Sequence, residues 1–157
     1  MKEAAPEDLD RAREAAARVL ASGLVQTPLA RGSGEVLEPV PIHTSDGGGI
    51  AGWFIGIAAA GRLAGFLQLA ADLAFRRSSS FQRRPPSLEG CPEVADWLDR
   101  SRILDRARTR ATAGESLAEP FLTYDQNPDR LVWAVGVTDP QGRESTIYVA
   151  GDFVYRA

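Results

Sequence analysis

The chain has 157 residues, of which 44% are hydrophobic and 25% are charged, a composition typical of globular proteins. Its formal net charge of −3 is spread over both halves, so no nucleic-acid partner is expected. One cysteine, Cys91, excludes an intrachain disulfide, and a single histidine, His43, leaves too few ligands for a zinc-type site, so we expect neither a metal nor a cofactor.

The chain opens with "MKEAAPEDLD", which is acidic and lacks the apolar core of a secretory signal. Together with the lone cysteine, this favours a reducing compartment, and we expect a cytoplasmic protein. A helix is predicted over residues 6–22, because proline and three acids occupy its first turn and apolar residues recur on one face.

The run from Gly49 to Phe75 is apolar enough to be considered as a membrane span. Arg62 falls near its middle, where a charge costs a few kcal/mol in a bilayer, and glycines interrupt it. A buried sheet explains the run better, and no membrane partner is expected.

Two stretches, residues 34–76 and 114–156, share an ordered set of short matches. Each contains a Trp-x-x-Gly followed by a β-branched residue, at "WFIGI" and "WAVGV", and then a Gly-Arg pair. Asp72 follows Trp53 by nineteen residues, and Asp152 follows Trp133 by the same number. A period of about eighty is too long for a solenoid and predicts a duplicated small domain.

The second stretch is the easier to interpret. Strand-forming runs at "EPFLTY", "RLVWAVGV", "STIYVAG" and "DFVYR" alternate with turn signals such as "DPQGR", which predicts an antiparallel meander. In the first stretch, "RLAGFLQLAADLAF" fits an amphipathic helix as well as strands, and the alignment favours strands. "TSDGGGI" is then the first hairpin turn, because its glycines supply positive-φ positions.

A second helix is predicted over residues 92–114, with a break near Ser101, and its arginines are expected to pair with nearby acids on a solvated face. The segment from Arg76 to Gly90, rich in serine, proline and arginine, is a linker by composition. The predicted organisation is a first helix-plus-meander repeat at 1–78, a linker at 79–91 and a second repeat at 92–157.

The order of a helix followed by an antiparallel meander resembles the cystatin-like α+β fold group, and the copies are most similar to PepSY-type domains. The resemblance rests on "LVWAVGVTDPQGRESTIYVAGDFVY", with Trp133 as the aromatic residue and a Gly-containing turn. It implies an α+β fold of two tandem helix-plus-antiparallel-sheet repeats. The two sheets either join edge to edge into one continuous sheet, giving a monomer, or leave edges that pair between chains as a dimer.

Four side chains are candidates for ligand binding: Trp53, Trp133, His43 and Tyr124. Each tryptophan either packs its sheet against its helix, burying ~150–250 Å², or lines a groove. His43 aligns with Tyr124, which indicates a strand position that takes a ring for packing. No residue is expected to be catalytic; Cys91 is interpreted as a passive thiol and the recurring Asp72 and Asp152 as turn residues.

The sequence therefore favours a non-enzymatic binding or regulatory module that recognises a protein, a peptide or a small apolar ligand on its sheet face or edge. The alternative is an enzyme or a small-ligand carrier with a pocket between helix and sheet. That pocket would use His43, Tyr124 and Asp125.

Overall fold

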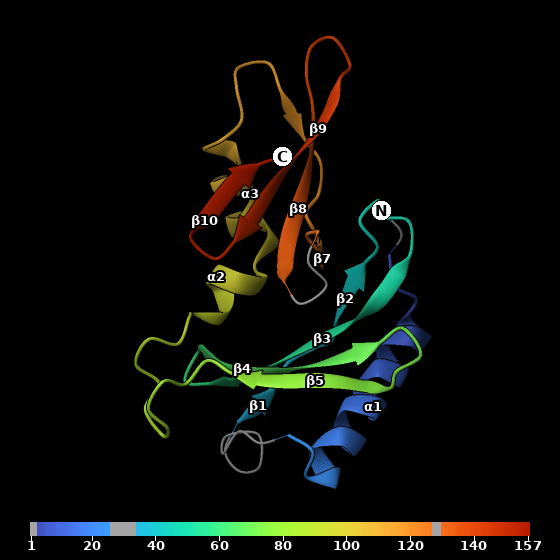
Figure 1. Cartoon of the computed structure of the whole chain (residues 1–157), viewed down its shortest axis with the longest axis vertical. Helices are drawn as coiled ribbons and strands as arrows, with labels where there is room; N and C mark the ends of the chain where they lie inside the picture. Colours follow the sequence, from blue (N-terminus) through green and yellow to red (C-terminus); the bar gives the residue numbers. More distant parts are fainter. Residues whose placement is uncertain (1–2, 26–33, 127–129) are drawn as a thin grey trace.

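The computed structural model describes residues 3–25, 34–126 and 130–157 (Figure 1). In chain order the first half contains α1 (Pro6–Ser22), β1 (Glu35–Val36), β2 (Val40–His43), β3 (Ile50–Ala59), β4 (Arg62–Ala70) and β5 (Phe75–Ser80). The second half contains α2 (Val94–Leu98), α3 (Arg100–Arg108), β6 (Ser116–Leu117), β7 (Phe121–Tyr124), β8 (Leu131–Thr138), β9 (Glu144–Ala150) and β10 (Phe153–Arg156).

The strands of the described residues form one open sheet of ten strands, in the order β10-β9-β8-β7-β2-β3-β4-β5, with β1 added to β3 and β6 to β8. Every pairing is antiparallel except that of β2 with β7, where Ile42 lies opposite Leu122 and His43 opposite Thr123. The expected joining of the two halves into a continuous sheet is confirmed. The protein is a mixed α/β protein with a large, mostly antiparallel sheet and few helices.

The segment that the sequence left open between helix and strand is a strand, β4. It pairs with β3 along nearly its whole length, from Gly52 opposite Ala70 to Ala59 opposite Arg62. Side chains on both faces of β4 are buried, so its sequence is almost continuously apolar. It therefore lacks the alternation of apolar and polar residues by which a half-buried strand is recognised. Gly52 belongs to this close pairing, because a Cβ there would lie 2.5 Å from the Leu69 carbonyl oxygen.

The two turns that the sequence predicted are both present. Between β2 and β3, the carboxylate of Asp46 accepts hydrogen bonds from the Gly48 N–H (2.9 Å) and the Thr44 hydroxyl (2.6 Å). Between β8 and β9, Asp139 accepts from the backbone N–H groups of Gln141 and Arg143, each at 2.9 Å. Short aspartate side chains thus close both hairpins.

Helix α1 has the predicted bounds. The second helix is shorter than predicted, and its predicted break near Ser101 is found at Asp99. Asp99 has extended backbone angles (φ −80°, ψ 109°), and its carboxylate accepts from the Ser101 N–H. The residue therefore ends α2 and caps α3, since an aspartate satisfies an N–H at a helix start. Helix α3 ends at Arg108, six residues before the predicted C-cap glycine Gly114.

The helices cover opposite faces of the sheet. Alternate residues of β3 divide between two cores: Trp53 and Ile55 pack with α1, whereas Phe54 packs with the core that includes α3. Strands β2 and β7 lie side by side and are parallel, and the later strands of each half are added on the outer side of its own first strand. The two halves are therefore related by a rotation of about half a turn around the strand direction, which puts their helices on opposite faces. Figure 1 shows α1 against β3–β5 and α2 and α3 beside β8–β10.

The larger core belongs to both halves. Ile42, Phe54 and Leu63 from the first half pack in the same cluster as Trp133 and Ile147 from the second. The smaller core, around α1, is built from the first half alone. The halves therefore share their interior instead of meeting as two closed domains.

The serines that composition placed at the start of the linker lie in β5, which extends through Ser80. At the other end of the connection, Cys91 is buried and its carbonyl accepts from Arg62 (Nη1 to O, 2.8 Å). The connection is thus anchored to the sheet at its C-terminal end. In the described part of the chain, no helix combines the length and the apolar character needed to cross a membrane.

Candidate functional site

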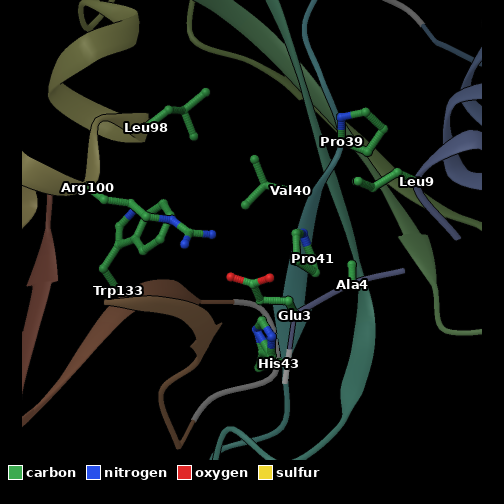
Figure 2. Close-up of a pocket in the computed structure, with 10 residues that line it drawn as sticks. All are labelled: Glu3, Ala4, Leu9, Pro39, Val40, Pro41, His43, Leu98, Arg100 and Trp133. Atoms are coloured by element: carbon green, nitrogen blue, oxygen red, sulfur yellow. The ribbon is translucent and has the colours of Figure 1, made fainter. Parts of the chain in front are cut away.

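A cavity of about 270 Å³ lies at the seam between the halves, where β2 runs past the end of β7 (Figure 2). The ladder between these strands pairs only Ile42 and His43 of β2, and it stops before Pro41. Pro39 and Pro41 have no N–H to offer a neighbouring strand, so the edge stays open here. The remaining walls come from the residues just before and in α1 and from the junction of α2 and α3.

The break between α2 and α3 shapes one wall. Leu98 ends α2, Arg100 begins α3, and the extended Asp99 between them lets both side chains line the cavity. The indole N–H of Trp133 donates to the Trp97 carbonyl at 2.8 Å. That carbonyl lies in the last turn of α2, where backbone carbonyls lack intrahelical partners. The hydrogen bond therefore fixes the position of the indole and also supplies the missing donor for the Trp97 carbonyl.

His43 lies below the opening at the end of β2 and is 2% exposed. Its ring packs edge-on against Phe121, with 5.8 Å between centroids, and its carbonyl accepts from the Thr123 hydroxyl at 2.8 Å. Burial, followed by nearby positive charge that includes Arg100, holds the pKa of the His43 imidazole below its ordinary value. The ring is therefore neutral at pH 7.

Two opposite charges face the same cavity. In Figure 2 the carboxylate of Glu3 and the guanidinium of Arg100 point into the open space from different walls. Within the described part of the chain, neither group forms an ion pair. The cavity thus combines an apolar surface from Val40, Leu98 and Trp133 with one acid and one base.

The structure brings together two of the four predicted ligand residues, His43 and Trp133, and separates the others. Trp53 lies on the opposite face of the sheet, where it is 2% exposed and packs with α1. Trp133 is 1% exposed, so both tryptophans are core residues, and Trp133 also lines the cavity.

Tyr124 belongs to a polar cluster that ties β7 to β4 and β5. Its hydroxyl accepts from Arg76 (Nη1 to Oη, 2.9 Å) and donates to Gln68 (Oη to Oε1, 3.2 Å). The Arg76 guanidinium also lies over the tyrosine ring, 5.0 Å from its centroid. Gln68 is fully buried, so this cluster holds the two halves together rather than lining the cavity.

Asp125 is engaged elsewhere, in an ion pair with Arg130 (2.7 Å) and a short hydrogen bond from the Tyr155 hydroxyl. Burial and the hydrogen bond to Asp125 raise the pKa of Tyr155 above its ordinary value. His43, Tyr124 and Asp125, the set proposed for the enzyme or carrier alternative, therefore do not converge on one pocket.

Eight of the ten residues that line the cavity were not predicted from the sequence, among them Glu3, Leu98 and Arg100. Arg100 was interpreted as part of a solvated helix face paired with acids. Asp105 does pair with Arg108 (2.7 Å), but Asp99 caps α3 instead of pairing with Arg100. The only local signal is the aspartate followed by Arg100 and Ser101, which is compatible with a helix start.

A second surface is the face of the second half that α2 and α3 leave uncovered. Phe153, on β10, is 78% exposed and borders a hollow of about 270 Å³ with Arg130, Ala150 and Tyr155. Tyr155 packs against Tyr148 with 5.3 Å between ring centroids. This bare face is opposite the one on which Val149 and Val154, the neighbours of these residues in β9 and β10, pack with the core. An exposed phenylalanine beside two tyrosines in contact, whose rings are tilted by 32° relative to one another, makes an apolar surface.

Among the residues that the structure describes, no group of three or more His, Cys, Asp or Glu side chains is arranged to hold a metal ion. Comparisons with protein-family models, with curated proteins and with solved structures gave no match to the chain. The geometry of the seam cavity and of the bare face therefore carries the functional argument.

Proposed function

We propose that the protein is a non-enzymatic binding module whose ligand, a small and largely apolar molecule, occupies the seam cavity. The observation that carries this proposal is the cavity at the part of β2 that does not pair with β7, where Val40 and Pro41 of β2 form the lining together with Leu98 and Trp133. Ligand pockets are concave and mostly apolar, with a few polar groups that orient the ligand. The volume of about 270 Å³ lies just below the range usual for drug-sized ligands and suits a smaller one.

The state of His43 favours binding over catalysis. A general base works best when its pKa lies near the operating pH, and burial moves the pKa of His43 away from that range. Its ring is buried, packs edge-on against Phe121 and forms part of the cavity lining. These features suit a neutral residue of the cavity lining.

The test uses two-dimensional amide NMR with indole and phenol as small apolar probes. We expect saturable shifts at the Trp133 indole N–H and the Val40 amide, and smaller ones at Trp53. A cavity-filling variant, Leu98→Trp, should abolish the shifts, whereas Phe153→Ser should leave them. Shifts confined to the Phe153 face, or persisting in Leu98→Trp, would count against the cavity as the site.

We also propose that the two halves are copies of one PepSY-like unit of the cystatin-like fold group. The support is the equivalence of their pairings: Trp53 lies opposite Pro41, and Trp133 lies opposite Leu122, at matching places in the two meanders. In both halves a two-residue strand adds to the longest strand. A cytoplasmic location and a regulatory role are part of the same proposal.

A second candidate function is recognition of a protein at the bare face, which the exposure of Phe153 favours. A single exposed aromatic side chain beside an apolar hollow is a usual anchor in protein contacts. The most direct partner is a second copy pairing through the terminal strand β10. The sequence predicted an edge-paired dimer only as the alternative to a continuous sheet, so this candidate rests on the exposure of Phe153. Sedimentation velocity of the intact chain should then show a dimer that Phe153→Ser dissociates. A monomer across the accessible concentration range would remove this candidate.

A further inference from the structure

Arg100 and Glu3 define the charge character of the seam cavity. Their guanidinium and carboxylate face one space, and within the described residues neither is neutralised by an ion pair. Building on the proposed binding function, we infer that the ligand is a small zwitterion with an apolar body, of the class of free amino acids with aliphatic or aromatic side chains. Its carboxylate binds Arg100 and its ammonium binds Glu3.

Arg100 is suited to hold the carboxylate. It is the first residue of α3, directly after Asp99, whose extended backbone and capped Ser101 N–H fix where the helix begins. The rigid, planar guanidinium binds a carboxylate through two parallel hydrogen bonds, which a lysine at this position would not reproduce. Trp133 and Leu98 form the wall beside it, and this apolar surface strengthens the charge interaction by excluding water.

Glu3 supplies the opposite charge on the other side of the opening. A ligand ammonium group has three N–H donors. One can bind the Glu3 carboxylate, and the others can bind water or carbonyl oxygens. His43 lies beneath Glu3 in Figure 2 and adds a neutral polar ring, so among the described side chains that line the cavity Arg100 carries the positive charge and Glu3 the negative one. A ligand with only one charge would bring that charge toward a like charge on the rim.

The apolar walls select the body of the ligand. Val40, Pro41, Leu98 and Trp133 offer no charged group to a side chain, so an aliphatic or aromatic side chain gains from leaving water here. The volume of about 270 Å³ is below that of usual drug-sized sites and favours a single amino acid over a longer peptide.

The experiment compares four probes on the intact protein by calorimetry and by amide NMR. L-Phenylalanine is the zwitterion, N-acetyl-L-phenylalanine the anion and L-phenylalaninamide the cation, while indole reports on the apolar cavity alone. We expect the zwitterion to bind roughly tenfold or more tightly than either singly charged analogue, because each loses one charge-assisted hydrogen bond.

Two variants should change which of the three amino-acid probes binds most tightly. Arg100→Gln leaves Glu3 as the charged side chain of the described lining, so L-phenylalaninamide should become the best of the three amino-acid probes. Glu3→Gln leaves a net positive rim, so N-acetyl-L-phenylalanine should become the best. Arg102→Gln, which changes an arginine already paired with Asp96, is the matched control and should keep the original order.

The outcomes separate the two levels of inference. If indole binds in the seam but the three amino-acid probes bind equally or not at all, the zwitterion inference is wrong and the binding function stands. The same holds if the two variants leave the order unchanged while their melting temperatures match that of the parent protein. If neither indole nor any amino acid shifts the seam residues, both proposals fail.

Discussion

Replacing Trp133 with alanine tests whether the indole is part of the core, as its 1% exposure indicates, or a residue kept for the ligand. Truncating a buried tryptophan to alanine typically costs ~3–5 kcal/mol, through lost transfer free energy and the cavity left behind. The change also removes the donor to the Trp97 carbonyl, and an unsatisfied buried acceptor adds roughly 1–3 kcal/mol where water does not reach it. We therefore expect the free energy of unfolding to fall by about 3–5 kcal/mol or more.

Urea unfolding followed by far-ultraviolet circular dichroism measures this loss directly. For a chain of this size, a loss of 3–5 kcal/mol corresponds to a drop in melting temperature of roughly 6–20 °C. Trp133→Phe keeps a ring but removes the N–H, so it should retain part of the lost stability. A loss below about 1 kcal/mol for Trp133→Ala, together with lost affinity for indole, would show that Trp133 serves the ligand and that the core assignment is wrong.

Three further predictions concern the seam and its supports. Tyr124→Phe removes the hydroxyl that donates to the fully buried Gln68, so it should lower the free energy of unfolding by about 1–3 kcal/mol. A change within about 0.5 kcal/mol, the usual scatter of neutral surface substitutions, would contradict a structural role for this hydroxyl. The pKa of His43 is lower in the folded protein than its ordinary value of 6.5, so the unfolded chain binds a proton at a higher pH than the folded one does. The free energy of unfolding should therefore fall as the pH drops below about 6.5, until the pH reaches the folded-state pKa. Urea titrations between pH 5 and pH 8, with His43→Gln as a control that flattens this component, measure the effect, and identical slopes for both proteins would refute it. Asp99→Ala removes the cap on the Ser101 N–H and should cost about 0.5–2 kcal/mol by urea unfolding, while Asp99→Asn should retain most of the stability, since asparagine caps almost as well.

The order of elements was largely predictable because strong local signals mark it. Asp46 and Asp139 lie in turns whose glycines and prolines punctuate the chain, and Pro6 with the following acids marks the start of α1. The alignment of the two stretches also decided β4, whose own periodicity is ambiguous because both of its faces are buried. In that case a comparison within the chain supplied what local pattern lacked.

The candidate site was only partly predictable because it depends on how distant segments meet. His43 and Trp133 stood out as scarce or large side chains, but Glu3 and Arg100 resemble ordinary surface charges until the parallel pairing of β2 with β7 is known. Nothing in the sequence fixes that pairing, and an antiparallel joint would have put both helices on one face. The break near Ser101 was predicted, but the capping role of Asp99 was not, since a capping aspartate inside a helical pattern also fits a surface position.

The cluster that contains Ile42, Phe54 and Leu63 beside Trp133 and Ile147 has a consequence for how the protein unfolds. A protease cut in the connection between β5 and α2 would not release two independent pieces, because separating them strips the common interior and exposes its hydrocarbon side chains to water. Cleaved chains should stay associated and melt in a single transition. The two halves, although separate along the chain, should therefore unfold as one cooperative unit.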